Sequence, residues 1–201
     1  MMKVLKTALL AQAALAIMSA LPLAAQAQGT PAADAAWVEE ARKLSMALPP
    51  KLVAVLQEEI AKVGHEGAIG VCRDQAPAMA RKASEQSGWN VRRVSLRNRN
   101  PKAVPDAWER AALEDFDRRA AAKEPPARLE RAEVVQENGV AVQRYMRALP
   151  TLELCTNCHG AADKLSPAVA AKLAELYPQD RATGYQVGDI RGAMTLRRPA
   201  P

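Results

Sequence analysis

Aromatic residues and cysteine are scarce in this chain of 201 residues, and its charge is only mildly unbalanced. Phe, Trp and Tyr make up 3% of the residues, so few side chains are available for stacking against nucleic-acid bases. The net charge of +6 comes from interspersed basic and acidic residues, which gives no reason to expect a nucleic-acid partner. Three cysteines in the whole chain are compatible with an oxidising compartment.

One pentapeptide indicates a cofactor. Cys155-Thr156-Asn157-Cys158-His159 reads C-x-x-C-H, the attachment motif of a c-type haem. Two thiols one helical turn apart can add to the two vinyl groups of haem, and the next residue then presents its imidazole to the iron from the same side. The motif predicts one covalently attached haem c, held by Cys155 and Cys158, with His159 as the proximal axial ligand.

The N-terminus has the layout of a secretory signal peptide. Lys3 and Lys6 form a basic start, an apolar stretch follows over about residues 8–23, and Ala25-Gln26-Ala27 matches a cleavage site. A single membrane anchor is the alternative, but the cleavage site favours removal of residues 1–27. We therefore expect an exported, periplasmic protein with no stable membrane span. Export agrees with the haem motif, because haem is attached to C-x-x-C-H outside the cytoplasm in bacteria.

The rest of the chain predicts a single α+β domain. Asn138-Gly139 between two strand-like segments is typical of a β-hairpin, and Pro49-Pro50 is expected to end one helix and begin the next. A small antiparallel sheet flanked by several helices would occupy residues 50–198, after a linker and helix at residues 28–49. The sequence predicts helices over 35–48, 50–63, 77–86, 106–121 and 167–177, and strands over 91–96, 128–136, 140–147 and 193–197.

Several longer motifs occur together in one known family. They are Val71-Cys72 with Ala76-Pro77, then residues 91–101, 105–109, 155–160, 177–185 and 188–193. With these motifs, roughly residues 50–196 resemble the c-type haem domains with a PAS-like fold, the cyanobacterial type of haem protein with a cysteine ligand. The resemblance implies a PAS-like α+β fold and a distal iron ligand at Cys72. Ala103 departs from the family pattern, which puts only a loop hydrogen bond in doubt.

Cys72 is the cysteine outside the C-x-x-C-H motif. From the residues alone it is either an inert buried thiol, since it shares a helical face with Ile69 and Ala76, or an iron ligand, since unpaired thiols are unusual in secreted proteins. Arg73 would favour its thiolate form, and the resemblance implies the ligand. Other candidate ligands are His65, which we expect in an exposed turn, and methionines that we expect in the core. These methionines are Met46, Met79, Met146 and Met194.

Two interpretations without haem stay open. Zinc needs four ligands, which Cys72, Cys155, Cys158 and His159 together would supply. A thioredoxin-like disulfide is the other, although the motif lies outside any βαβ pattern. A cluster of arginines is also ambiguous, because it could pair with haem carboxylates or form a solvated strand face. These arginines are Arg92, Arg93, Arg97 and Arg99.

The expected ligand pair leads to the expected function. A histidine and a thiolate would fill both axial positions and leave none for a substrate or peroxide, so we expect no enzyme activity. The anionic sulfur would stabilise ferric iron, which predicts low-potential electron transfer with a redox partner protein. The alternative is sensing of redox state, CO or NO through displacement of Cys72, with a separate signalling partner.

Overall fold

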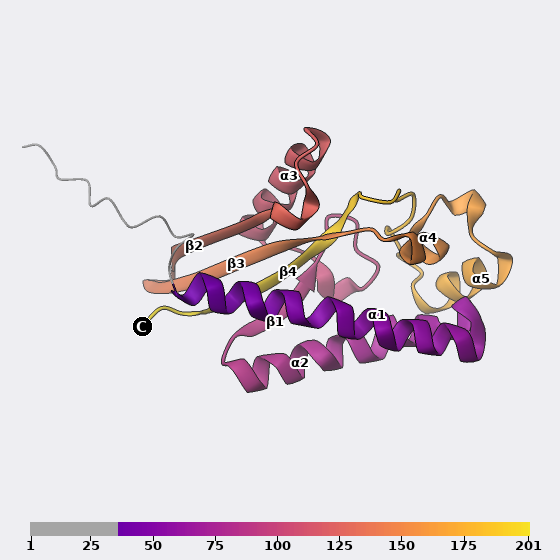
Figure 1. The fold of residues 1–201 in the computed structure, drawn as a ribbon, viewed down its shortest axis with the longest axis horizontal. Coiled ribbons are helices and arrows are strands. Elements are labelled where there is room, and N and C mark those ends of the chain that lie inside the picture. The colour runs from indigo at the N-terminus through magenta and orange to yellow at the C-terminus, as the bar shows by residue number, and fades with distance from the viewer. Residues whose placement is uncertain (1–35) are drawn as a thin grey trace, which may run out of the picture.

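The computed structural model describes residues 36–201, so the predicted signal peptide and its cleavage site lie outside the described residues. The fold is α+β, as predicted: helices flank one small antiparallel sheet (Figure 1). In chain order the elements are α1 (Ala36–Gly70), a π-helical segment (Val71–Gln75), α2 (Ala76–Ser87), β1 (Asn90–Val94), α3 (Ala107–Ala121), β2 (Glu130–Glu137), β3 (Val140–Pro150), α4 (Glu153–His159), α5 (Pro167–Leu176) and β4 (Ile190–Pro199).

The sheet has four strands in the order β1-β4-β3-β2, and every neighbouring pair is antiparallel. The hairpin predicted at Asn138-Gly139 is confirmed: it joins β2 to β3, and both turn residues have positive φ, 52° and 81°. Such values are typical of the type I′ turns that match the twist of paired strands. The C-terminal strand β4 therefore lies inside the sheet, between strands formed much earlier in the chain.

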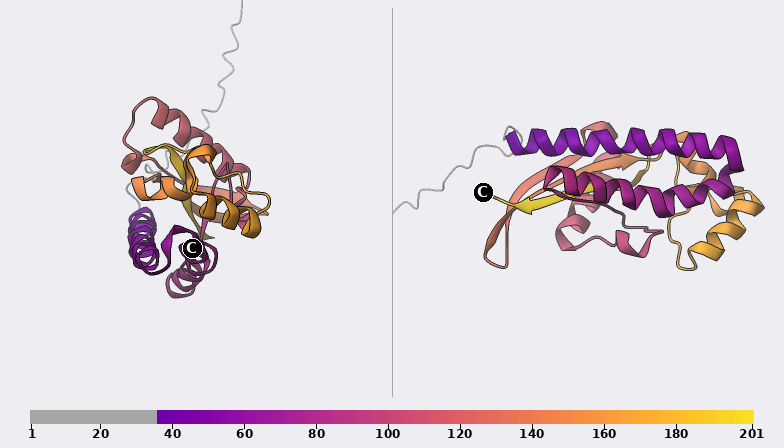
Figure 2. Two further views of the ribbon diagram at one scale, coloured as in Figure 1. Left: turned by 90° about the vertical axis from the view of Figure 1, so that its right-hand side faces the viewer. Right: turned by 90° about the horizontal axis from the view of Figure 1, so that it is seen from below.

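Helices cover both faces of the sheet. Helices α1 and α2 lie side by side along one face, and α3 lies on the other (Figures 1 and 2). On β3, consecutive residues point to opposite sides: Tyr145 packs with Trp89 in the core under α1 and α2, and Met146 packs with Phe116 in the core under α3. Both faces of the sheet therefore carry a buried core.

Helix α1 continues through Pro49 and Pro50, so the predicted break at these residues is wrong. A proline in a helix removes one N–H donor and strains the preceding turn, but its fixed φ is itself helical. The backbone leaves helical geometry later, at Gly64, where φ is +72°. Leu44 and Leu48 pack against the sheet core before the prolines, and Ile69 packs against α5 after them. The helix thus runs unbroken through the prolines as far as Gly64, and a further helical stretch beyond this kink packs on α5.

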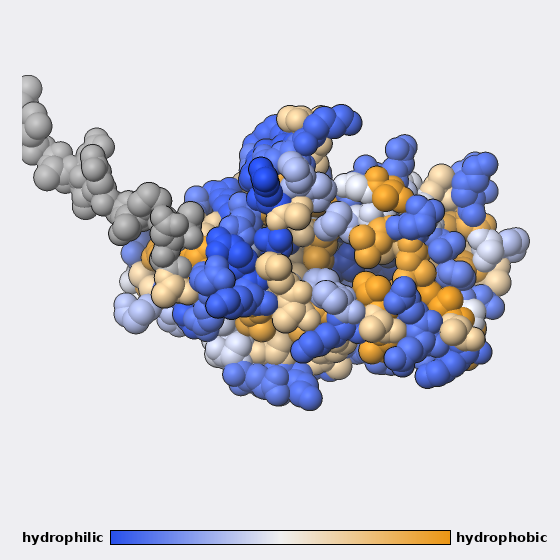
Figure 3. All heavy atoms as spheres, viewed as in Figure 1, coloured by the Kyte–Doolittle hydropathy of each residue, from blue (hydrophilic) through white to orange (hydrophobic). Residues whose placement is uncertain are grey.

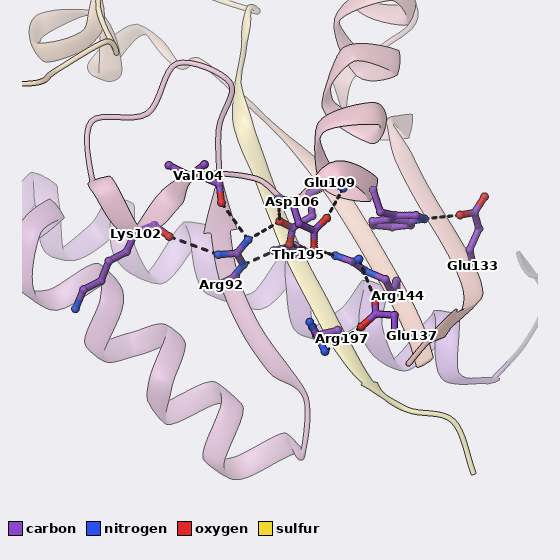
Figure 4. A network of polar contacts seen from close by, with 11 residues as sticks. Arg92, Lys102, Val104, Asp106, Glu109, Glu133, Glu137, Arg144, Thr195 and Arg197 are labelled. Carbon is purple, nitrogen blue, oxygen red and sulfur yellow. Dashed lines mark hydrogen bonds and ion pairs between the residues drawn. The ribbon is translucent and has the colours of Figure 1, made fainter. Parts of the chain in front are cut away.

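A buried polar network fixes the start of α3 on the sheet (Figure 4). Asp106 and Glu109 form a reciprocal capping box at this start, where Pro105-Asp106 predicted a helix. The Glu109 carboxylate is 1% exposed; it also pairs with Arg92, accepts a hydrogen bond from Thr195 Oγ1 at 2.9 Å, and lies 3.5 Å from Arg144. The carboxylate thereby links α3 to β1, β4 and β3.

Helices α4 and α5 gather with the end of α1 at one end of the sheet (Figures 1 and 2). Ile69 of α1 packs there with Val169 and Leu173 of α5, and Cys158 of α4 lies against this cluster. Apolar side chains are concentrated on the same end of the surface (Figure 3). Within residues 36–201, no helix combines the length and apolar character that crossing a bilayer requires.

Candidate functional site

Helix α4 presents the C-x-x-C-H motif at this end of the sheet. Cys155 and Cys158 lie one helical turn apart, as the motif requires, and both are half-buried free thiols. The helix ends directly after His159, where Gly160 N–H donates to Thr156 O at 2.8 Å. A Cβ atom at position 160 would lie 2.6 Å from that same oxygen, so glycine is needed for this exit.

The His159 ring is oriented by the main chain. Its Nδ1 lies 2.7 Å from Ala182 O, and because a carbonyl only accepts, Nδ1 carries the proton. Burial, followed by the positive charges of Arg191 and Arg99, lowers the pKa of His159 well below its usual value. The ring is therefore neutral at pH 7, with a lone pair on Nε2. Arg191 Nη2 donates toward Nε2 at 3.3 Å.

An ion pair holds the carbonyl that orients His159. Arg99 and Asp180 pair at 2.9 Å with side chains 8% and 12% exposed, and Asp180 Oδ1 accepts from Ala182 N–H at 2.8 Å. Arg99 Nη2 also donates to Cys158 O at 2.6 Å. The pair thus ties the end of α4 to the segment 180–182. Such outer contacts set the orientation and basicity of a histidine ligand.

Cys72 lies in the π-helical segment between α1 and α2. Its side chain is exposed, so the alternative of an inert thiol packed in the core is wrong. Surrounding protein atoms nevertheless raise the pKa of this thiol through burial, while Arg93, Arg99 and Arg191 act to lower it. Short π-helical stretches are frequent at functional sites.

The three arginines whose charges act on Cys72 also act on His159. Their positive charges also lower the pKa of the His159 ring, and Cys155 lies near enough to Cys72 to raise its pKa further. The four residues singled out from the sequence therefore lie around one group of arginines, although Cys72 precedes the motif by most of the domain. These residues are Cys72, Cys155, Cys158 and His159.

The other candidate iron ligands lie elsewhere. Met146 and Met194 are core residues on opposite faces of the sheet, as predicted for methionine. Met46 is half exposed on α1, and Met79 is half-buried on α2, so neither belongs to the buried core that we predicted for them. His65 follows the kink at Gly64, within helix α1, and is half-buried, so the exposed turn predicted for it is wrong.

The geometry also bears on the interpretations without haem. Among residues 36–201, no three His, Cys, Asp or Glu side chains converge closely enough to hold a metal ion, so the zinc interpretation is not supported. The described sheet is entirely antiparallel, so the motif lies outside any βαβ unit, as predicted. A thioredoxin-like site therefore lacks its structural context.

The residues present fit a c-type haem. Cys155 and Cys158 stand one turn apart on α4, and the following histidine keeps a free Nε2 lone pair. The thiol of Cys72, on another segment, lies near enough to each motif cysteine for their charges to interact. Cys158, Leu165 and Leu176 all pack against the apolar cluster of Ile69, Val169, Leu173 and Tyr177, and such surroundings suit an apolar macrocycle. These side chains could hold a haem between α4 and the π-helical segment.

Sequence reasoning missed the residues that support the histidine. The roles of Asp180 and Ala182 depend on main-chain contacts, and Arg191 appeared only within a longer motif of the resemblance. The predicted arginine cluster is divided. Arg92 pairs with Glu109, away from the motif, while Arg97 lies 3.7 Å above the Tyr185 ring and donates to Thr183 O.

Comparison with known proteins gives the family. The family model Tll0287-like, described as Tll0287, matches residues 6–199. This chain belongs to the Tll0287-like family. Among solved structures, the Tll0287-like chain is similar to "Crystal structure of the cyanobacterial heme-protein Tll0287", with 30% identity and a TM-score of 0.52, over 65% of this chain and 73% of that one. No curated protein matches. The resemblance to a family of haem domains is thus confirmed.

Proposed function

We propose that this chain is an exported monohaem protein. In this proposal Cys155 and Cys158 attach one haem c through thioether bonds, and His159 and Cys72 are the proximal and distal axial ligands. The solved relative described as a heme-protein supports the cofactor. The proposed activity is low-potential electron transfer in the periplasm with a redox partner protein, without enzyme activity.

The hydrogen bond between His159 Nδ1 and Ala182 O is the observation that carries this proposal. It selects the tautomer whose Nε2 can bind a metal, and it makes the imidazole a stronger donor. A histidine kept only for packing would not need a fixed tautomer, a carbonyl held by a buried ion pair, and a lone pair directed at a cation.

The surrounding residues suit electron transfer. When bound, haem supplies one-electron exchange between ferric and ferrous iron. A thiolate at Cys72 would favour the ferric state, and the charges of Arg93 and Arg99 would make that thiolate less costly. Both motif cysteines are only half-buried, so one edge of the cofactor would be reachable by a partner protein.

A sensing function is the second candidate, and the π-helical segment favours it. One extra residue per turn makes a π-helix less stable than an α-helix, and such segments interconvert with regular helix. If Cys72 were displaced by CO, NO or reduction, Val71–Gln75 would be free to rearrange and to move α2. The sensor would then act on a separate signalling partner.

Absorbance spectra of the exported protein, oxidised and reduced, test the proposal. We expect haem that stays attached after denaturation, and a ferric thiolate signature that is lost in Cys72→Ser but kept in His65→Ala and Met79→Leu. An intact N-terminus by mass spectrometry would contradict export and cleavage after Ala27. Coincident spectra for the wild type and Cys72→Ser would reject Cys72 as a ligand, and a protein purified without haem would reject the whole proposal.

The two candidate functions differ in the reduced state. Electron transfer predicts the same axial ligands before and after reduction, because small reorganisation favours fast exchange. Sensing predicts a reversible change of ligand on reduction or on addition of CO. Turnover with hydrogen peroxide would contradict the proposal that the protein is not an enzyme.

A further inference from the structure

Arg191 is a buried cation without a counter-ion. Its side chain is 6% exposed, yet no carboxylate within residues 36–201 forms a salt bridge with it. The guanidinium contacts only neutral groups: Ser95 Oγ at 3.4 Å, His159 Nε2 at 3.3 Å and the face of the Tyr185 ring at 5.1 Å from its centroid. Its buried Nε has no acceptor. Buried charges are ordinarily paired, so this arrangement is incomplete by itself.

Another buried arginine of the sheet, Arg144, does have anionic partners and serves as a comparison. Arg144 is 4% exposed and also leaves its Nε without an acceptor. Its other nitrogens, however, pair with Asp106 at 2.5 Å, Glu137 at 3.0 Å and Glu109 at 3.5 Å. The two arginines are equally buried, and only Arg191 lacks an anion.

The neighbours of Arg191 make an anion more favourable still. Arg93 lies near enough for its positive charge to act on Arg191. Arg99 is already neutralised by Asp180, whereas Arg93 forms no salt bridge within the described residues. The site therefore carries an excess of buried positive charge on the side where His159 Nε2 points.

Iron binding at His159 would increase this imbalance. The lone pair that Arg191 Nη2 contacts is the one that a proximal ligand gives to the metal. Arg191 would then keep two neutral partners, the Ser95 hydroxyl and the Tyr185 ring, and neither is an anion. A group that enters this site with iron must also bring an acceptor for the guanidinium.

We infer that Arg191 binds a carboxylate of the haem, an inference that rests on the proposed function. Haem carries two propionate groups, and a guanidinium is the side chain that matches a carboxylate with two parallel hydrogen bonds. Three of the four arginines first considered for this role already have a polar partner: Arg92 pairs with Glu109, Arg99 with Asp180, and Arg97 donates to Thr183 O. Arg93 has no salt bridge within the described residues, but unlike Arg191 it makes no hydrogen bond to His159.

Haem with esterified carboxylates provides the test. In the full chain carrying Cys155→Ala and Cys158→Ala, haem would bind reversibly, and its affinity can be compared with that of haem dimethyl ester. We expect Arg191→Met to weaken binding of haem by about 10- to 100-fold, the range of a charge-assisted hydrogen bond. Binding of the ester should be unchanged, because it has no carboxylate to lose.

Arg97→Met is the matched control, since Arg97 is a nearby arginine bound to a carbonyl rather than to a carboxylate. It should affect haem and its ester equally. Equal weakening of both ligands by Arg191→Met would overturn the inference, because Arg191 would then act through His159 or through folding. No effect of Arg191→Met on either ligand would overturn it as well.

A second measurement uses the natural haem-loaded protein and does not depend on the cysteine variants. The resonance Raman bending band of the haem carboxylates reports their hydrogen bonding. It should shift in Arg191→Met and not in Arg97→Met, and an unshifted band would overturn the inference. A wild-type protein that binds neither haem nor its ester rejects the proposed function itself, whereas tight and equal binding of both rejects only the role of Arg191.

Discussion

Replacing Asp180 by Asn tests whether the buried ion pair positions the proximal histidine. The substitution keeps an oxygen for Ala182 N–H but removes the negative charge that faces Arg99 at 2.9 Å. Breaking a buried ion pair costs about 3–5 kcal/mol when one charge is left alone. Arg99 keeps the carbonyls of Cys158 and Ala182 as acceptors, so about 2–3 kcal/mol is expected here.

This loss is large enough to measure by thermal unfolding of the haem-loaded protein. For a chain of this size, each kcal/mol lowers the melting temperature by about 2–4 °C, which gives a decrease of about 4–12 °C. Glu175→Gln on α5 is the control, because Glu175 pairs with Lys172 at the surface. A surface pair contributes about 0.5 kcal/mol, and its loss should change the melting temperature by about 1–2 °C.

The reduction potential separates a positioning role from a purely structural one. A looser hydrogen bond from His159 to Ala182 makes the imidazole a weaker donor, so ferric iron is less stabilised and the potential rises. Asp180→Asn should therefore both unfold earlier and show a higher potential. A lower melting temperature with an unchanged potential would refute the positioning role, and no change in either would refute the whole argument.

Two further substitutions test the interior of the sheet. Glu109→Gln should lower the free energy of unfolding in urea by about 3 kcal/mol, since it leaves Arg144 and Arg92 facing a neutral group, and a loss below about 1 kcal/mol would contradict the network. Tyr145 donates to Glu130 at 2.6 Å, and burial raises its pKa to about 12 from a usual 10. The free energy of unfolding of the wild type should therefore exceed that of Tyr145→Phe by about 2 kcal/mol at pH 7, and this difference should disappear between pH 10 and 12. A difference that persists at pH 12 would contradict the raised pKa.

The sequence predicted those elements whose ends are set by a few neighbouring residues, such as a turn or a helix cap. Asn138-Gly139 marks the hairpin because few other residues adopt positive φ at both turn positions. Asp106 marks the start of α3 because its side chain caps free N–H groups. The prediction of a break at Pro49-Pro50 failed for the opposite reason: Leu44 and Leu48 pack on the core of the sheet, and the sequence around the prolines does not contain these contacts.

In the site, too, the local motif was predictable from the sequence and the long-range contacts were not. Cys155, Cys158 and His159 follow from one short motif, whose spacing carries its chemistry. The placement of Cys72 beside them came from the family resemblance. Contacts such as that between Arg99 and Asp180 join residues 81 positions apart through buried polar atoms. No spacing rule gives such a contact, because it exists only once the loop before β4 has folded over α4.

The acceptor that orients His159 is a main-chain carbonyl, so it does not depend on which side chain stands at position 182. Every amino acid at position 182 carries the same carbonyl, so a substitution there does not remove the acceptor itself; because Ala182 is fully buried, a larger side chain would act by displacing the loop. A carboxylate in this role could be lost by one codon change. Natural substitutions in this loop would therefore change the strength of the hydrogen bond to His159 gradually, by moving the carbonyl, rather than remove its acceptor in one step.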